Sequence, residues 1–285
     1  MTSPTQGSPS SHVALTRRQA LRRLSAATLL GLGLWPGRLP ADDTASGEFR
    51  FVVINDIHYM SDECGDWLRG VLGKIKAHDE VDFCLLAGDL TEHGTREHLD
   101  ATRLLLDGLD RPVHVVIGNH DYETKTGDRS HYDAVFPDRL NYHFEHRGWR
   151  FIGLDTSDGL KYNETLVPTH TLRWLDDQLP RLNPKDPTVV FTHFPLGPGV
   201  TYRPLNADDV LERFRAFNLQ TIFSGHFHGQ SERMQGNAPV LTNVCCALKR
   251  GNHDGTKQKG YFLCSVKEGH LERRFVPVDL PEATR

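Results

Sequence analysis

Short apolar runs recur along the chain, and amphipathic stretches lie between several of them. The runs are rich in β-branched and aromatic residues, which is typical of buried strands. The stretches repeat apolar side chains every three or four positions, which predicts helices that pack by one face. The predicted strands are residues 49–54, 81–86, 113–117, 150–154, 188–191 and 221–223, and the predicted helices are residues 67–77, 98–109, 172–179 and 207–217.

The alternation of strands and helices predicts an α/β layered core with βαβ connections. Beyond Ser231 the pattern changes to short strands separated by glycine-containing turns, at residues 232–234, 240–244, 260–266 and 270–276. A second sheet formed by this tail fits best, so that two sheets pack face to face with helices outside. No repeat or clear linker interrupts residues 48–280, and the expected organisation is one domain over residues 42–285.

The first 41 residues have the composition of an export signal. They contain five arginines and no aspartate, glutamate or lysine, and the apolar run 26–35 follows four of those arginines. The run is too short for a membrane span, which needs about 20 apolar residues. Thr16-Arg17-Arg18-Gln19-Ala20-Leu21 resembles a twin-arginine signal, which predicts passage through the Tat machinery and a periplasmic or extracellular location, with no stable membrane insertion after cleavage. A disordered basic tail or an uncleaved anchor is the alternative.

Charge and cysteine content limit the classes of partner and bound group that we expect for this chain. Cleavage after Ala41 would change the formal net charge from −4 to −9, and no basic stripe is present, so nucleic acid is not an expected partner. An anionic substrate must then be bound through local charges such as metal ions. The five cysteines show no CxxC spacing and predict neither a zinc cluster nor a disulfide framework. The oligomeric state cannot be deduced from these features.

Five groups of metal-binding residue types follow five of the apolar runs directly, at the ends where α/β sheets bind ligands. Two of the groups pair ligands two positions apart, which share a face on an extended chain. Taken singly, each group has an ordinary explanation as a helix cap, a turn or a hydrogen-bonded histidine. Together and in this order they predict a metal site: Asp56 with His58, Asp89, Asn119-His120-Asp121, His193, and His226 with His228.

The same blocks read D-x-H, G-D-x-x-x-x-G, G-N-H-D, a strand-end histidine and G-H-x-H over about residues 49–229. This order resembles that of the calcineurin-like metallophosphoesterases, with a cyclic-nucleotide phosphodiesterase-like branch as one option. The resemblance implies a four-layer αββα sandwich of two mixed β-sheets flanked by helices. It also implies that one metal is bound by Asp56, His58, Asp89 and His228 and the other by Asp89, Asn119, His193 and His226, and that His120 stands beside the scissile phosphate, held by Asp121.

Ligands of carboxylate, amide and imidazole type without thiolate suit Fe, Mn, Zn or Co. Two such ions about 3.5 to 4 Å apart can hold a bridging hydroxide and clamp phosphoryl oxygens for in-line attack. A protonated His120 could donate its proton to the leaving oxygen, which typically contributes about 10² to 10⁴ in rate. The expected activity is therefore hydrolysis of phosphodiesters or phosphomonoesters, with diesters slightly preferred. A catalytically silent metal-binding or scaffold module on the same fold is the alternative.

Substrate specificity is expected to come from loops. The loop 196–206 offers Tyr202 for stacking and Arg203 for a phosphate group, although both are ordinary in a Pro/Gly-rich surface loop. A second Gly-Asn-His-Asp at residues 251–254 follows no apolar strand and is interpreted as a turn, with His253 as a weak candidate for a substrate contact. Glu92 stands where purple acid phosphatases place a metal-binding tyrosine, which argues against a purple ferric enzyme.

Overall fold

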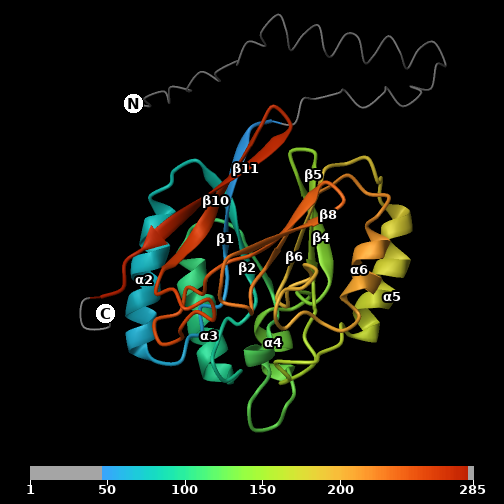
Figure 1. Cartoon of the computed structure of the whole chain (residues 1–285). Coiled ribbons are helices and arrows are strands. Elements are labelled where there is room, and N and C mark those ends of the chain that lie inside the picture. Colours follow the sequence, from blue (N-terminus) through green and yellow to red (C-terminus); the bar gives the residue numbers. More distant parts are fainter. Residues whose placement is uncertain (1–46, 282–285) are drawn as a thin grey trace, which may run out of the picture. The chain divides into compact units, whose positions relative to one another are not determined.

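The computed structural model describes residues 47–281, and these residues form two β-sheets with helices on their outer faces (Figure 1). The predicted export segment, residues 1–41, lies outside the described residues, so that interpretation stays a prediction. Figure 1 shows α2 and α3 beside one sheet and α5 and α6 beside the other. The four layers confirm the predicted sandwich of two mixed sheets flanked by helices. None of the helices within residues 47–281 has the length and apolar character that crossing a membrane requires.

The first sheet is parallel in its centre and antiparallel at one side. Strands β1, β2 and β3 run parallel, and the hairpin of β10 and β11 joins β1 in antiparallel pairing. The strand order is β11 (His270–Val278), β10 (Lys259–Lys267), β1 (Phe49–Ile54), β2 (Val81–Ala87) and β3 (Val113–Val116). The parallel arrangement places the carboxyl ends of β1, β2 and β3 at one edge of the sheet.

The second sheet repeats this plan with four parallel strands and an antiparallel strand at each side. Its order is β4 (Tyr142–His146), β5 (Trp149–Leu154), β6 (Thr188–Thr192), β7 (Leu219–Ser224), β9 (Ala238–Thr242) and β8 (Ser231–Gln235). The prediction that the tail after Ser231 makes the second sheet was wrong. Its first hairpin extends the second sheet and its last hairpin extends the first, because an apolar pattern identifies a strand but not its neighbour.

Side chains of β1 alternate between two hydrophobic cores, one on each face of the first sheet. Phe49, Phe51 and Val53 face the second sheet, whereas Val52 and Ile54 face the helices. Between the sheets the rings of Phe51 and Phe83 stack with centroids 5.3 Å apart. Because the central strands are buried on most of both faces, they read in the sequence as largely apolar runs.

Helices complete the two outer layers. The longer ones are α2 (Asp62–Lys76), α3 (Arg96–Asp107), α5 (Thr169–Gln178) and α6 (Ala207–Arg213), joined by α4 (Ser130–Val135) and the 3₁₀ turns η1 (Asn119–Asp121) and η2 (Leu179–Arg181). Helix α2 begins five residues earlier than predicted because the Ser61 side chain accepts the backbone N–H of Cys64. Helix α4 and strand β4 were not predicted, since a six-residue helix and a half-exposed edge strand carry little apolar periodicity.

Candidate functional site

The loops that leave the carboxyl ends of β1, β2, β3, β6 and β7 meet at one end of the sandwich. They bring all the predicted metal-ligating side chains within contact of one another, in two groups that share Asp89. The seven side chains come from both sheets, although up to 172 positions of sequence separate them. They are buried, with relative exposures of 7% or less. The set consists of Asp56, His58, Asp89, Asn119, His193, His226 and His228.

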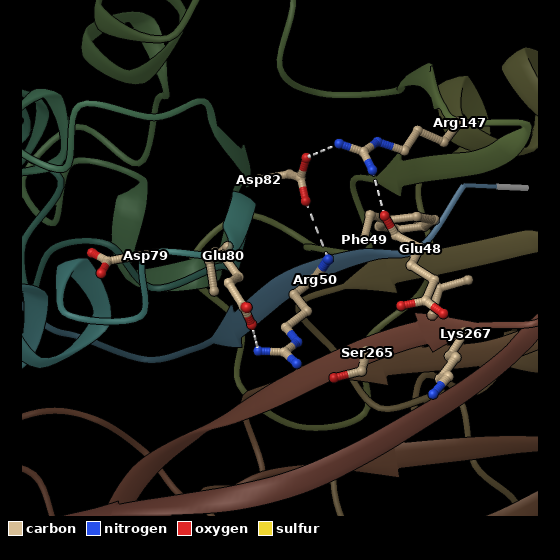
Figure 2. A pocket seen from close by; sticks show the side chains of 11 residues that line it. Glu48, Phe49, Arg50, Asp79, Glu80, Asp82, Arg147, Ser265 and Lys267 are labelled. Atoms are coloured by element: carbon tan, nitrogen blue, oxygen red, sulfur yellow. Dashed lines mark hydrogen bonds and ion pairs between the residues drawn. The ribbon is translucent and has the colours of Figure 1, made fainter.

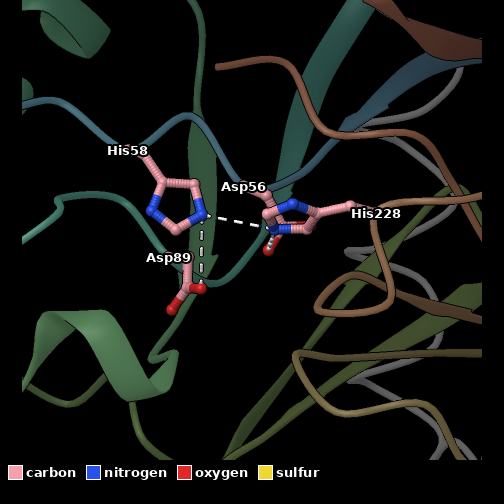
Figure 3. A group of neighbouring side chains, drawn as sticks. All are labelled: Asp56, His58, Asp89 and His228. Atoms are coloured by element: carbon pink, nitrogen blue, oxygen red, sulfur yellow. Dashed lines mark hydrogen bonds and ion pairs between the residues drawn. The ribbon is translucent and has the colours of Figure 1, made fainter. Parts of the chain in front are cut away.

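The first group contains Asp56, His58, Asp89 and His228 (Figure 3). Figure 3 shows the rings of His58 and His228 directed toward each other, and their Nε2 atoms are 3.3 Å apart. Asp89 Oδ2 lies 3.5 Å from His58 Nε2, and Asp56 Oδ1 lies 3.3 Å from His228 Nε2. Two nitrogens and two carboxylate oxygens therefore point at one small volume.

The second group contains Asp89, Asn119, His193 and His226. The Nε2 atom of His193 lies 3.1 Å from Asn119 Oδ1, 3.1 Å from His226 Nδ1 and 3.3 Å from Asp89 Oδ1. Asp89 thus directs one oxygen toward each group, as a bridging carboxylate would. Its Oδ1 also accepts the backbone N–H of His120 at 2.9 Å, which holds the carboxylate in place.

In each of the four histidines of the two groups, the outer ring nitrogen lies close to an oxygen atom. The other ring nitrogen therefore faces the centre of its group. His193 Nδ1 lies 3.1 Å from Ala87 O, His226 Nε2 lies 2.8 Å from Tyr162 O, His228 Nδ1 lies 3.1 Å from Gly251 O, and His58 Nδ1 lies 3.0 Å from Glu92 Oε2. Metal-binding histidines are fixed in tautomer and orientation in this way. The inward nitrogens, the two carboxylates and the Asn119 amide form a donor set that fits divalent transition metals.

The two histidines of the last block experience opposite electrostatic surroundings. Burial, helped by the neighbouring His193, lowers the pKa of His226 to about 3. Burial also acts to lower the pKa of His228, but the carboxylate of Asp56 outweighs it and raises that pKa to about 11. A low pKa keeps His226 neutral, which is the form that binds a metal ion.

The backbone is strained at most of these positions. Asp56, His58, Asp89, His226 and His228 all have positive φ, between 43° and 62°. This left-handed region is uncommon for residues other than glycine, and such strain concentrates at functional sites. Paired ligands were expected from the sequence to share one face of an extended chain. The backbone at these positions is not extended, so that geometry was wrong, although the correct side chains were placed together.

Two glycines permit the close approach of the carboxylates. A Cβ atom at Gly118 would lie 2.2 Å from Asp89 Oδ1, and one at Gly225 would lie 2.5 Å from Asp56 Oδ2. These distances are far below van der Waals contact, so a side chain at either position would displace a carboxylate. The glycines of the G-N-H-D and G-H-x-H blocks thus have a packing role.

The imidazole ring of His120 is held by the backbone carbonyl of Glu92 and not, as expected, by Asp121. Its Nδ1 lies 2.9 Å from the carbonyl oxygen of Glu92, which leaves Nε2 toward the cavity. The carboxylate of Asp121 instead accepts the backbone N–H groups of Thr91 and Gly118, both at 2.9 Å. Burial, helped by the negative charge of Asp89, raises the pKa of Asp121 to about 7. Asp121 therefore orders the loops that carry Asp89 and Asn119 rather than the imidazole of His120.

Two residues beside His120, Glu92 and Arg250, were not predicted from the sequence as part of the site. Glu92 lies 3.0 Å from His58 Nδ1, and both its oxygens contact the guanidinium of Arg250. Arg250 comes from the loop between β9 and β10, directly before the Gly-Asn-His-Asp segment that is interpreted from the sequence as a turn. The only available signal was Glu92 itself, an acidic residue within the G-D block.

A cavity of about 520 Å³ opens over the two groups. Tyr202 lines it, as predicted for a stacking residue, and His253 borders it as well. Arg203, predicted as a phosphate contact, does not line the cavity. Its Nε donates to Leu196 O at 2.8 Å and its Nη2 to Asp208 Oδ1 at 2.5 Å, so its charge is already paired. Leu160 and Tyr162, from the long loop after β5, were not predicted.

The chain is similar in sequence to proteins named as phosphodiesterases. A 3',5'-cyclic-nucleotide phosphodiesterase of Nostoc sp. is 27% identical over 212 residues, which cover 66% of this chain and 74% of that protein. A protein of Arcobacter nitrofigilis named as a probable glycerophosphodiester phosphodiesterase is 27% identical over 172 residues, covering 56% of this chain and 62% of that one.

Solved structures show the same fold. A purple acid phosphatase from yellow lupin (Lupinus luteus) superposes with a TM-score of 0.57 at 12% identity, over 81% of this chain and 52% of that chain. This chain thus spans about half the length of the lupin enzyme. The family model described as calcineurin-like phosphoesterase matches residues 49–230, which include every residue of the two groups. The chain belongs to the calcineurin-like phosphoesterase family.

Proposed function

We propose that the protein is a binuclear metal-dependent phosphodiesterase. The observation that carries this proposal is the common orientation of His58, His193, His226 and His228. Each has one ring nitrogen close to an oxygen and offers the other to one of the two groups that share Asp89. Asp56, His58, Asp89 and His228 would hold one divalent ion, and Asp89, Asn119, His193 and His226 would hold the other. Fe, Mn and Zn suit these ligands.

Bound metal ions would lower the pKa of a water molecule toward neutrality and neutralise charge on the phosphoryl group. The chain's own residues supply the rest. Asp89 separates the two sites and is held by the His120 backbone. His120 Nε2 faces the cavity and is positioned to donate a proton to the leaving oxygen.

Diesters are the preferred substrates for two reasons. The cavity over the metal groups continues past the phosphate position to Leu160, Tyr162 and Tyr202, which leaves room for a second substituent on phosphorus. Both curated relatives described above carry phosphodiesterase names. Surface loops generally vary more than the elements they connect, so the loops over the cavity would determine which diester is the natural substrate.

The test is hydrolysis of bis-p-nitrophenyl phosphate, p-nitrophenyl phosphate and cyclic AMP by metal-stripped protein refilled with Mn, Fe or Zn. We expect activity to require metal, and the diester to have the higher kcat/KM. Asp89→Ala should abolish activity and lower bound metal, because it removes one oxygen from each group. His120→Ala should retain metal and lose about 10² to 10⁴ in kcat.

Asp110→Ala is the matched control, since Asp110 is an exposed aspartate that pairs with Lys76 away from the site. It should keep full activity and metal content. Metal-independent hydrolysis, or inactivity of the folded wild type in every metal form with all three substrates, would contradict the proposal. Retention of both metals without turnover would favour a silent binding module.

A further inference from the structure

Arg250 and Glu92 form an ion pair at the wall of the cavity. Arg250 Nε donates to Glu92 Oε2 at 2.9 Å, and Nη2 donates to Oε1, so the guanidinium and the carboxylate meet edge to edge. Such bidentate pairs are rigid and directional. Glu92 is mostly buried, whereas the side chain of Arg250 is 39% exposed toward the cavity that it lines.

The pair adjoins the position of the leaving group. Arg250 Nη2 lies 3.4 Å from His120 Nε2, the nitrogen that faces the cavity. The other terminal nitrogen, Nη1, has no hydrogen-bond partner among residues 47–281. Arg250 therefore keeps N–H groups available beside the proposed proton donor.

The charge of the pair is as informative as its position. Arginine beside a phosphate site ordinarily adds a positive charge that favours the most negative substrate. Here the carboxylate of Glu92 already cancels that charge, so Arg250 offers directional donors without a net charge. A diester carries one negative charge, whereas a monoester carries about −1.5 to −2 near neutral pH. At this wall of the cavity, the second charge of a monoester would meet an ion pair that carries no net positive charge.

We propose that Arg250 binds a phosphoryl oxygen of the substrate beside His120, and that Glu92, by neutralising Arg250, makes the site select monoanionic diesters over dianionic monoesters. This inference rests on the proposed function, because it assigns the diester preference of that site to one residue pair. Arg250 is the contact residue and Glu92 acts through it.

Glu92→Gln is the first test, with kcat/KM measured for bis-p-nitrophenyl phosphate and p-nitrophenyl phosphate at saturating metal. The substitution keeps the shape of the side chain and leaves Arg250 with its full positive charge. We expect the ratio of diester to monoester activity to fall about tenfold, as a charge difference near the surface implies. Weaker metal binding through His58 would lower both activities together and leave the ratio unchanged.

Arg250→Gln should move the same ratio in the opposite direction. It removes the donors and exposes the Glu92 carboxylate to the substrate, so diester kcat/KM should fall about 10- to 100-fold and monoester kcat/KM further. Arg250→Lys keeps the charge without the planar fork and should recover part of the diester activity. The neighbouring ion pair of Lys249 and Glu63, outside the cavity, supplies the controls Lys249→Gln and Glu63→Gln, which should leave the ratio unchanged.

Binding of inorganic phosphate by calorimetry, at about pH 8 where it is a dianion, gives a readout that needs no turnover. Metal-loaded Glu92→Gln should bind phosphate about tenfold more tightly than wild type, and Arg250→Gln more weakly. Equal changes for both esters in both variants, together with unchanged phosphate affinity, would overturn the role of the pair. An inactive wild type would instead overturn the proposed function, while the phosphate titration still tests the pair.

Discussion

The two ends of the sandwich both carry a charged hollow of similar size, but their charges are arranged differently. The hollow at the carboxyl ends of the parallel strands measures about 520 Å³ and the hollow beside the amino ends of β1 and β2 about 480 Å³. In the second hollow, Figure 2 shows Arg50 beside Glu80 and Arg147 beside Asp82. Both arginines there are paired with an anion, and most of these four side chains are exposed.

In the first hollow, groups of the same kind face one another. Imidazole nitrogens lie 3.1 Å and 3.3 Å apart, and two carboxylates are buried among them. Buried polar groups that converge in this way fit a bound cation, whereas paired surface charges are satisfied by each other and by water. The two hollows thus cannot be distinguished by their volumes, but they differ in how their hydrogen-bonding groups and charges are arranged.

The sharpest way to break this comparison is the same substitution at both ends. Asp56→Asn removes a buried charge that contacts His228 and accepts the backbone N–H of His226. We expect kcat/KM to fall by at least about 10³, since metal-based charge stabilisation is worth several kcal/mol. Asp82→Asn removes the anion beside Arg147 in the second hollow and should leave kcat/KM unchanged. Equal losses at both ends would show that the distinction drawn here is false.

Metal binding should also separate the two ends in stability. Saturating Mn²⁺ or Zn²⁺, at about 100 times its Kd, should stabilise the folded wild type by about 2.7 kcal/mol through preferential binding. Thermal unfolding of chelated and metal-loaded protein measures this as a rise in Tm. Asp56→Asn should lose most of the rise, and Asp82→Asn should keep all of it. A rise retained in Asp56→Asn would place the metal elsewhere.

The strand pattern and the strand-end residues allowed most of this site to be predicted from the sequence. Strand β1 was predicted at its observed bounds because its aromatic and β-branched run is interrupted only by Arg50 and stops before Asn55. The ligands follow such runs directly, so finding the strands located them. Strand β4 was not predicted, because only one of its faces is covered. The pairing partners of β8 to β11 were not predicted either, because strand pairing depends on packing between distant segments.

The residues around the metal groups were harder to predict. Arg250 is 158 positions from Glu92 in the sequence, and only the fold brings them together. Arg203 had the right chemistry but is paired with Asp208, five residues away on the same loop and helix. A sequence lists candidate charges, but whether a charge is free or paired is decided by tertiary contacts.

A glycine-to-alanine substitution gives a smaller but independent test of the end of the sandwich that carries the two metal-ligating groups. Gly225→Ala would bring a Cβ atom within 2.5 Å of Asp56 Oδ2 and 2.8 Å of the carbonyl oxygen of Ala87. Overpacking of this kind costs about 1 to 3 kcal/mol, which urea unfolding would detect, and metal affinity should fall with it. Gly70→Ala in helix α2 is the control, because nothing lies within 4 Å of its Cβ position. It should stabilise the protein by about 0.5 to 1 kcal/mol.

The smallest effect is expected where a surface ion pair is broken. Glu80→Gln removes the partner of Arg50 in the second hollow, where the two side chains are 69% and 47% exposed. Exposed pairs contribute about 0 to 1 kcal/mol, so unfolding in urea should change by less than that and hydrolysis should be unaffected. The same glutamate-to-glutamine exchange at Glu92, which is mostly buried and touches both His58 and Arg250, should alter substrate preference. Two identical chemical changes would then differ only in burial and in what each carboxylate contacts. A change in the diester to monoester ratio for Glu80→Gln would mean that long-range charge, rather than local pairing, sets the preference.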